Sequence, residues 1–254
     1  METHAHHIHK APGNKFWHFF FEFFMLFLAV SAGFYAENLR EEIKYEKEIQ
    51  SNMRSLLTDL KTDVAYFNST LAANEFACSA ADSLIALLNG DRANTAEIYY
   101  LARIITANFN YYLSNQKTFD QMKFSGALKL IKPRNLLDSI SDYYAAIPWL
   151  ESHSNIVRMK VDEIHLANSE LFNAFVFEKM MHIEYTDFKQ AFTEINKPEG
   201  NPALLANDFK KINDVALRYH YFYSSIKFYD KTASQTIGKG KRLIELIKEE
   251  YHLE

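Results

Sequence analysis

The sequence has little cysteine, glycine or proline, and each scarcity excludes or disfavours a class of protein. The single cysteine, Cys78, cannot form an internal disulfide. Seven glycines and five prolines among 254 residues disfavour a turn-rich β architecture. The net charge is only −4 and acids and bases are interspersed, so there is no broad basic face for nucleic acid. Apolar residues make up 48% of the chain, which is enough for a sizeable core.

One long apolar run stands out, at residues 16–36, with the sequence FWHFFFEFFMLFLAVSAGFYA. As a helix it would span about 31 Å, which is the thickness of the hydrocarbon part of a bilayer. A buried core helix would usually show a polar face, and a signal peptide would have a shorter apolar run that ends in a cleavage site. The run holds a single acid, Glu22, and therefore predicts a retained transmembrane helix.

The predicted span has one face that differs from the rest. Helical spacing places a set of small and polar residues on one side: His18, Glu22, Ala29, Gly33 and Ala36. Ala29 and Gly33 form a small-xxx-small pair, which lets two helix backbones approach closely in lipid. Glu22 either reaches the headgroups or marks a packing contact or a proton-handling site. Because the small residues share its face, we expect this face to pack against another membrane helix.

Polar segments flank the predicted span. Residues 1–15 form a polar tail whose histidines could bind a metal, but a tail with incidental histidines is the interpretation that we favour: His4, His6, His7 and His9. Residues 37–52 carry mixed charges at helical spacing and predict a solvated helical stalk. The remainder, residues 53–254, is predicted to form a helical bundle.

A heptad-like seam opens the predicted bundle. Apolar or small residues recur at alternating spacings of four and three, which predicts one long helix that ends at Asn89-Gly90-Asp91. The seam residues are Met53, Leu57, Leu60, Val64, Phe67, Leu71, Asn74, Cys78, Ala81, Ile85 and Leu88. Cys78 is expected to act there as a small apolar side chain.

Further helices are predicted as far as the middle of the bundle. Thr95 is expected to cap a second helix, and Ser125-Gly126 to close a third, short one. Pro133 suits the first turn of the next helix, and Pro148 is expected to break the chain and restart it as a separate long helix.

The last part of the chain is also predicted to be helical. Residues 184–196 resemble a short helix, and 196–203 form the strongest loop signal. A final helix is expected from about residue 204, with loosening at Gly238 and Gly240. Since no long stretch alternates with period two, the predicted fold class is all-α.

No residue constellation predicts catalysis, a metal or a cofactor. Two acid-x-x-His pairs occur, Asp162 with His165 and Glu249 with His252, but a di-iron bundle needs further inward carboxylates that the apolar faces lack. Fifteen tyrosines serve either as half-buried edges of the core, which we favour, or as the lining of a groove for a peptide or small ligand.

The central segment FDQMKFSGALKLIKPRNLLDSISDYY resembles the signature of a family of single-span proteins from Bacteroidota-type bacteria (the DUF6090-like group). The matching residues are Phe119, Lys123, Ser125, Gly126, Leu130, Ile131, Leu136, Ile140, Tyr143 and Tyr144. The start of the stalk, residues 37–41, is similar too. The resemblance implies a cytoplasmic tail, one membrane helix and a periplasmic helical domain, and it implies no activity.

These observations lead to two functional expectations from different classes. The first is a non-enzymatic protein of the bacterial inner membrane that contacts the lipid bilayer through its span. It would act as a homo-oligomer or as an accessory subunit beside other membrane proteins. The second is a periplasmic sensory or ligand-binding bundle that works with a separate signalling partner. An enzyme ranks third, because no catalytic constellation supports it.

Overall fold

The computed structural model describes residues 15–90, 92–107, 111–185 and 191–253, and the predicted all-α class is confirmed. Helices make up more than four-fifths of the described chain, and its strands form a single small hairpin. The chain divides into two compact units, Met1–Ser51 and Asn52–Glu254.

The described part of the first unit is a single helix. It is the beginning of α1 (Lys15–Asn89), which is the one helix among the described residues that is long and apolar enough to cross a membrane. The large apolar side chains from Phe16 to Tyr35 are all solvent-exposed, by 42 to 71% of their surface. A helix satisfies its own backbone hydrogen bonds, so this segment can enter lipid without leaving polar groups unpaired.

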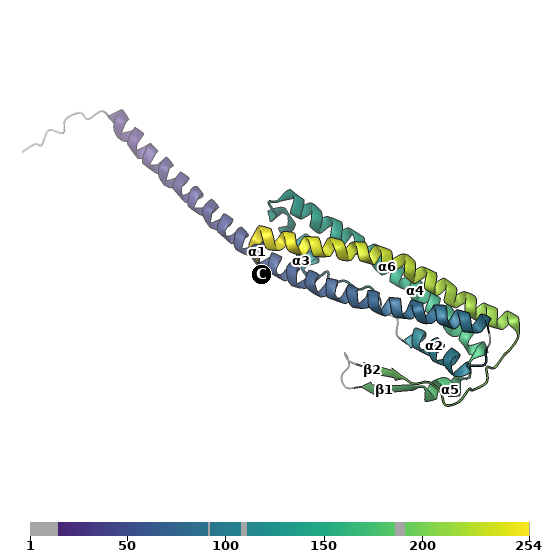
Figure 1. The fold of residues 1–254 in the computed structure, drawn as a ribbon. Helices are drawn as coiled ribbons and strands as arrows, with labels where there is room; N and C mark the ends of the chain where they lie inside the picture. Colours follow the sequence, from purple (N-terminus) through teal and green to yellow (C-terminus); the bar gives the residue numbers. More distant parts are fainter. Residues whose placement is uncertain (1–14, 91, 108–110, 186–190, 254) are drawn as a thin grey trace, which may run out of the picture. The chain divides into compact units, whose positions relative to one another are not determined.

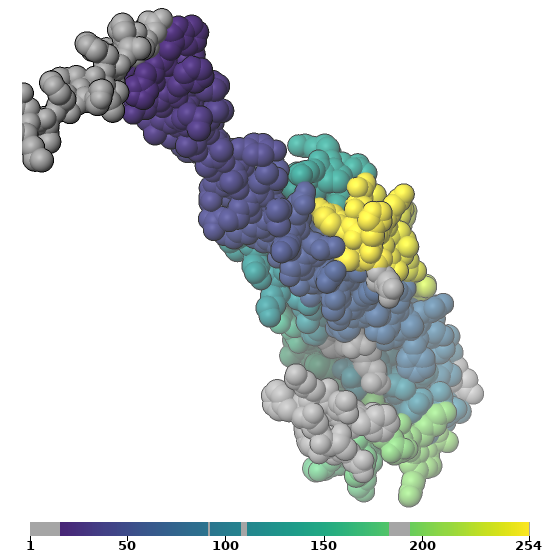
Figure 2. Space-filling model, turned by 90° about the vertical axis from the view of Figure 1, so that its left-hand side faces the viewer, coloured from purple at the N-terminus to yellow at the C-terminus, as the bar shows by residue number. Residues whose placement is uncertain are grey.

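Three long helices dominate the second unit. The remainder of α1 lies alongside α4 (Arg134–Leu171) and α6 (Phe209–Tyr251), and α6 runs antiparallel to the other two (Figure 1). In Figure 2 the yellow end of α6 lies against the teal start of α4. Three shorter helices stand between α1 and α4 along the chain: α2 (Thr95–Ala107), α3 (Lys117–Ser125) and η1 (Ala127–Leu130). Residues 111–116, which we call the α2–α3 segment, precede α3 and form no helix or strand.

The predicted seam of α1 forms one wall of the core. Nine of its eleven residues are buried, and Leu71 and Ile85 are partly buried. The prediction succeeds because a repeat of about 3.5 residues keeps these side chains on one face of a helix. Beside this seam the core takes three fully buried tyrosines, Tyr99, Tyr143 and Tyr219.

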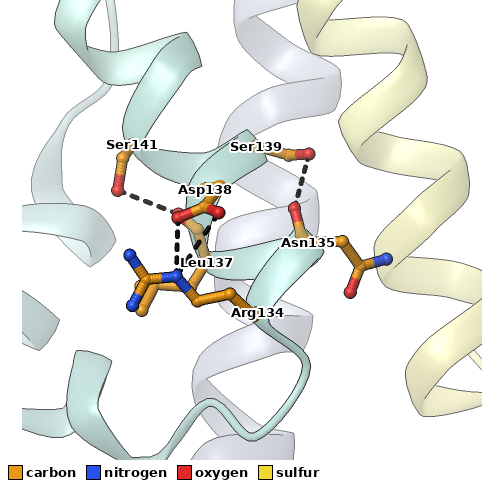
Figure 3. A network of polar contacts seen from close by, with 6 residues as sticks. All are labelled: Arg134, Asn135, Leu137, Asp138, Ser139 and Ser141. Carbon is orange, nitrogen blue, oxygen red and sulfur yellow. Dashed lines mark hydrogen bonds and ion pairs between the residues drawn. The ribbon is translucent and has the colours of Figure 1, made fainter.

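Polar side chains in the first turns of α4 form their hydrogen bonds and ion pair within the same helix (Figure 3). Pro133 stands at the N-cap, in agreement with its predicted place at the helix start. Arg134 forms an exposed ion pair of 3.1 Å with Asp138 one turn later. The hydroxyls of Ser139 and Ser141 donate to backbone carbonyls one turn earlier, at 2.8 Å each. Such exposed contacts stabilise a helix only slightly.

The predicted break at Pro148 is wrong. Helix α4 runs through this proline without interruption, although the residue has no N–H for the carbonyl one turn earlier. Ile147 and Leu150, on either side of it, are almost completely buried. The burial of both flanking turns therefore outweighs the cost of the missing hydrogen bond.

The helix predicted at residues 184–196 is also wrong. Strands β1 (Met181–Tyr185) and β2 (Ala191–Ile195) pair antiparallel there, with Met181 opposite Ile195. The N–H of Asn196 donates to Met180 O at 2.8 Å and extends the pairing. The hairpin follows a short helix, α5 (Ala174–Lys179), which Asn173 caps.

The ends of three helices differ from the predictions in detail. Asn94 caps α2 in place of Thr95, by accepting the N–H of Glu97 at 3.2 Å. Helix α6 begins at residue 209, five residues later than predicted, because Asp208 caps it. The loop predicted at residues 196–203 therefore extends to residue 208. The expected loosening at Gly238 and Gly240 is wrong, since α6 continues to Tyr251.

Candidate functional site

The predicted packing face of the span lies on the exposed first part of α1. His18, Glu22, Ala29, Gly33 and Ala36 are all exposed and, by helical spacing, share one side of the helix. A Cβ placed on Gly33 would meet nothing within 4 Å. The backbone at Gly33 is therefore open to close approach by another helix.

The second unit contains three clusters of buried polar side chains, and none of them was predicted as a site. In the first, which we call the Asp63 cluster, Asp63 is only 2% exposed. Its carboxylate accepts the hydroxyl of Ser114, the N–H of Asn115 at 2.7 Å and the hydroxyl of Tyr143 at 3.1 Å. These bonds join α1, the α2–α3 segment and α4.

Asp59 continues the Asp63 cluster one turn earlier on α1. Its carboxylate accepts the side-chain amide of Asn115 at 2.7 Å and the N–H of Thr118 at 3.2 Å. The residue before α3, Gln116, makes no side-chain cap of its own. A carboxylate of α1 therefore caps the first turn of α3, where unpaired N–H groups favour negative charge.

The second cluster surrounds Asp230 of α6, and we call it the Asp230 cluster. One carboxylate oxygen accepts both the side-chain amide of Asn74 at 2.8 Å and the hydroxyl of Tyr112 at 2.9 Å. The N–H of Tyr112 donates to Ser154 of α4 at 3.0 Å. Burial raises the pKa of Asp230, and the two hydrogen bonds and nearby Lys227 oppose that rise.

The third cluster, the Tyr219 cluster, lies near the other end of the core. The buried hydroxyl of Tyr219 donates to Ala102 O at 3.2 Å and accepts the amide of Asn168 at 2.9 Å. Nearby, Tyr99 donates to Ala203 O and accepts the N–H of Asn173. Several tyrosines thus belong to the interior of the core, further inside than the half-buried edges that the sequence predicted.

The polar side chains of the three clusters are hydrogen-bonded to other groups of the chain, both backbone and side chain. The α2–α3 segment has no helical or strand ladder to satisfy its polar groups, and buried groups of this kind need partners. Ser154 and Asp63 supply them from two helices, by accepting the N–H groups of Tyr112 and Asn115. Asp59 accepts the N–H of Thr118 at the start of α3. The carboxylates of Asp59, Asp63 and Asp230 are therefore hydrogen-bonded to groups of the protein itself. Together with Ser154, they connect α1, the α2–α3 segment, α4 and α6.

The remaining sequence candidates are scattered. Asp162, His165, Glu249 and His252 are all exposed. No group of three or more metal-binding side chains occurs within the described ranges. The four N-terminal histidines lie outside those ranges. Cys78 is buried, as its place on the seam predicts, and burial raises its pKa to about 12.

The polar clusters were missed because their partners are distant in the sequence. Asp63 and Tyr143 are 80 residues apart, and Tyr112 and Asp230 are 118 apart. One local signal existed, since Asn74 interrupts an otherwise apolar seam. A polar residue at such a position usually has a buried hydrogen-bond partner.

Similarity to known proteins gives no further guide to this chain. Comparison with protein-family models, with curated proteins and with solved structures finds no match.

Proposed function

We propose that this chain is a membrane-anchored helical subunit that works without catalysis of its own. In this proposal the first part of α1 crosses a bacterial inner membrane, and the second unit lies in the periplasm. The face around Ala29 and Gly33 packs against the span of a second copy or of another membrane protein.

One observation carries the proposal, namely an apolar helical run of 21 residues whose large apolar side chains are all exposed. Burial of so many phenylalanine side chains in lipid is strongly favourable, at about 25 cal/mol per Å². Trp17 and Tyr35 stand near the two ends of the run, where amphipathic rings favour the membrane interface. About 18 residues of helix separate them, or roughly 27 Å, which fits the bilayer core.

The assembly of the span is tested with Gly33→Ile. The full chain is extracted in mild detergent, and its mass is measured by light scattering after size-exclusion chromatography. Ser31→Ile is the matched control, because it adds similar bulk about 200° away around the helix, at 100° per residue. We expect Gly33→Ile to lower the mass of the assembly and Ser31→Ile to leave it unchanged. Equal masses for the parent and both variants would refute the packing role of this face.

The orientation is tested with Phe124→Cys, since Phe124 is 83% exposed on α3 and Cys78 is buried. We expect a membrane-impermeant maleimide to label this variant in intact spheroplasts. The unsubstituted chain is the control and should remain unlabelled. Labelling only after the spheroplasts are lysed would place the second unit in the cytoplasm instead.

A further inference from the structure

Two aliphatic side chains of the predicted stalk, residues 37–52, are exposed. Leu39 and Ile43 lie in the first unit, on the part of α1 that follows the apolar run, and 41% and 51% of their surfaces are exposed. A helix in water gains most of its stability by packing an apolar face. The large exposed fractions show that no other described part of the chain packs over these two side chains. They are therefore available to a second molecule.

The two residues continue a stripe that begins inside the apolar run. Residues at alternating intervals of four and three lie on one side of a helix. We call the set of six exposed residues that follow these intervals the α1 stripe: Met25, Ala29, Ala32, Ala36, Leu39 and Ile43. All three alanines of residues 16–36 belong to it. The α1 stripe therefore runs from the predicted span into the stalk without interruption.

The residue types along the α1 stripe suit two helices that lie side by side. In lipid, where the hydrophobic effect does not drive helices together, small residues such as alanine let two backbones approach closely. Gly33 flanks this part of the stripe, and its backbone is open to close approach. In the stalk the side chains of the stripe become large. The intervals assign Leu39 to position d and Ile43 to position a of a heptad, a combination that favours two parallel strands.

Two charged side chains beside the α1 stripe select a second copy of this chain as its partner. Glu42 and Lys47 are exposed and stand at the flanking positions g and e of successive heptads. They are five residues apart, or about 140° around the helix, so they do not meet within one chain. None of the ion pairs among the described residues involves either of them. In a parallel pair, position g of each helix lies beside position e of the other, so Glu42 of each copy meets Lys47 of the other.

The same charges distinguish parallel from antiparallel pairing. In an antiparallel pair of identical helices, Glu42 would lie beside Glu42 and Lys47 beside Lys47, and like charges repel. Two copies inserted in one membrane with the same orientation are also parallel. Glu46 and Gln50 occupy the next two positions, so the apolar stripe ends at Ile43, before the second unit begins at Asn52.

We propose that residues 25–47 of α1 pair in parallel with the same residues of a second copy. The alanines of the α1 stripe pack in lipid, Leu39 and Ile43 pack in water, and Glu42 of each chain contacts Lys47 of the other. This pairing rests on the proposed function, since it takes residues 16–36 as the membrane span, and it identifies the partner of that span as a second copy. Both chains use the same surface, so the interface is closed and the assembly is a dimer.

The charge contacts are tested with two differently tagged full-length variants, Glu42→Lys and Lys47→Glu. Each variant alone brings like charges together at both contacts, so we expect its dimer to be at least about threefold weaker than that of the parent, measured by sedimentation in detergent at low salt. A mixture of the two variants restores both attractive contacts, and we expect the mixed dimer to exceed either dimer of identical chains.

The matched control is the pair Glu41→Lys and Lys44→Glu, which makes the same changes of charge at positions f and b, on the outer side of the helix. We expect neither variant to weaken the dimer and their mixture to show no preference. Equal behaviour of the two pairs of variants overturns the proposal.

The position of the contact is tested by disulfide formation in the full chain, reconstituted in lipid nanodiscs and treated with a mild oxidant. Leu39→Cys places a thiol in the contact, and Glu41→Cys places one on the outer side. Both positions are exposed in the single chain, so accessibility does not distinguish them. We expect a disulfide-linked dimer from Leu39→Cys alone, and none through the native Cys78, which is buried. Equal yields from the two variants contradict the pairing.

The stalk pairing and the proposed function fail separately. If the charge variants and the disulfide show no pairing while Gly33→Ile still lowers the mass of the assembly, the stalk pairing is refuted and the packing face of the span stands. If Leu39→Cys forms its disulfide while Gly33→Ile leaves the mass unchanged, the stalk pairing stands and the packing role of Gly33 is refuted.

Discussion

Gly240 lies where α6 packs closely against Val64 of α1 and Tyr143 of α4, and replacing it with alanine tests the packing of the bundle. A Cβ at this position would lie 2.8 Å from Val64 Cγ2 and 3.1 Å from Tyr143 Cε2. Neither neighbour moves easily. Val64 is β-branched and stiff, and the hydroxyl of Tyr143 is held by Asp63.

Two opposing terms set the size of the effect. Alanine is favoured over glycine inside a helix by about 1 kcal/mol. Inserting a methyl group into a packed core costs about 1–3 kcal/mol. For Gly240→Ala we therefore expect a net loss of about 1 kcal/mol in the free energy of unfolding.

Gly238 on the same helix is the matched control. A Cβ there would meet only the flexible end of Arg242, at 3.9 Å. Gly238→Ala therefore keeps the helix advantage without the clash, and we expect a gain of about 0.5–1 kcal/mol. The two variants should differ by about 1.5–2 kcal/mol, or several degrees in melting temperature for a domain of this size.

The assay is urea or thermal unfolding of the full chain in one detergent, followed by circular dichroism at 222 nm. Gly240→Ala should unfold before the parent and Gly238→Ala after it. If both variants are equally stabilised, the close approach of α6 to α1 and α4 is refuted.

Two further predictions concern buried titratable groups. Burial raises the pKa of Asp230, so its ionised form costs stability at neutral pH, and this cost disappears as the pH falls below the ordinary aspartate pKa of about 3.9. Asp230→Asn keeps an acceptor for Asn74 and Tyr112; we expect a higher urea midpoint at pH 7 and little advantage near pH 3, and a lower midpoint at pH 7 would contradict this reasoning. Burial raises the pKa of Cys78 to about 12, which lowers the thiolate fraction at pH 8 about a thousandfold, so iodoacetamide should label the folded chain far more slowly than the denatured chain. Mass spectrometry measures both labelling rates, and equal rates would show that the thiol is accessible.

The helices could be predicted where the information is local. The seam from Met53 to Leu88 repeats often enough for its period to identify a helix and its buried face. Asp208 and Asn94 show the limit of this reasoning, because several capping residues stand near each helix start. Only the geometry of the loop decides which side chain accepts the N–H groups.

The failures concern features whose causes are distant in the sequence. A proline inside a helix is disfavoured locally, yet the core contacts of Ile147 and Leu150 keep α4 intact around Pro148. The hairpin at residues 181–195 is short, and its alternation covers only five residues in each strand. Neither segment contains a local sign of the contacts that determine its structure.

The candidate sites also differ in whether local sequence was sufficient to predict them. The face of the span follows from helical spacing alone, so the positions of its residues along the chain are sufficient to define it. The contact between Trp149 of α4 and Phe228 of α6 could not be predicted in this way, because the two residues become neighbours only when the two helices pack antiparallel. Stripes on single helices were visible, but which stripe remains outside the core depends on the topology of the bundle.

The contact between Val64 and Gly240 also has a consequence for biosynthesis. The seam of α1 emerges from the ribosome early, but α6, which covers part of it, is made about 150 residues later. At 5–20 residues per second this delay is on the order of ten seconds. During that time part of the apolar stripe on α1 is uncovered, and transiently exposed apolar surface is prone to aggregation. We therefore expect chains that terminate before α6 to aggregate more readily than the full chain.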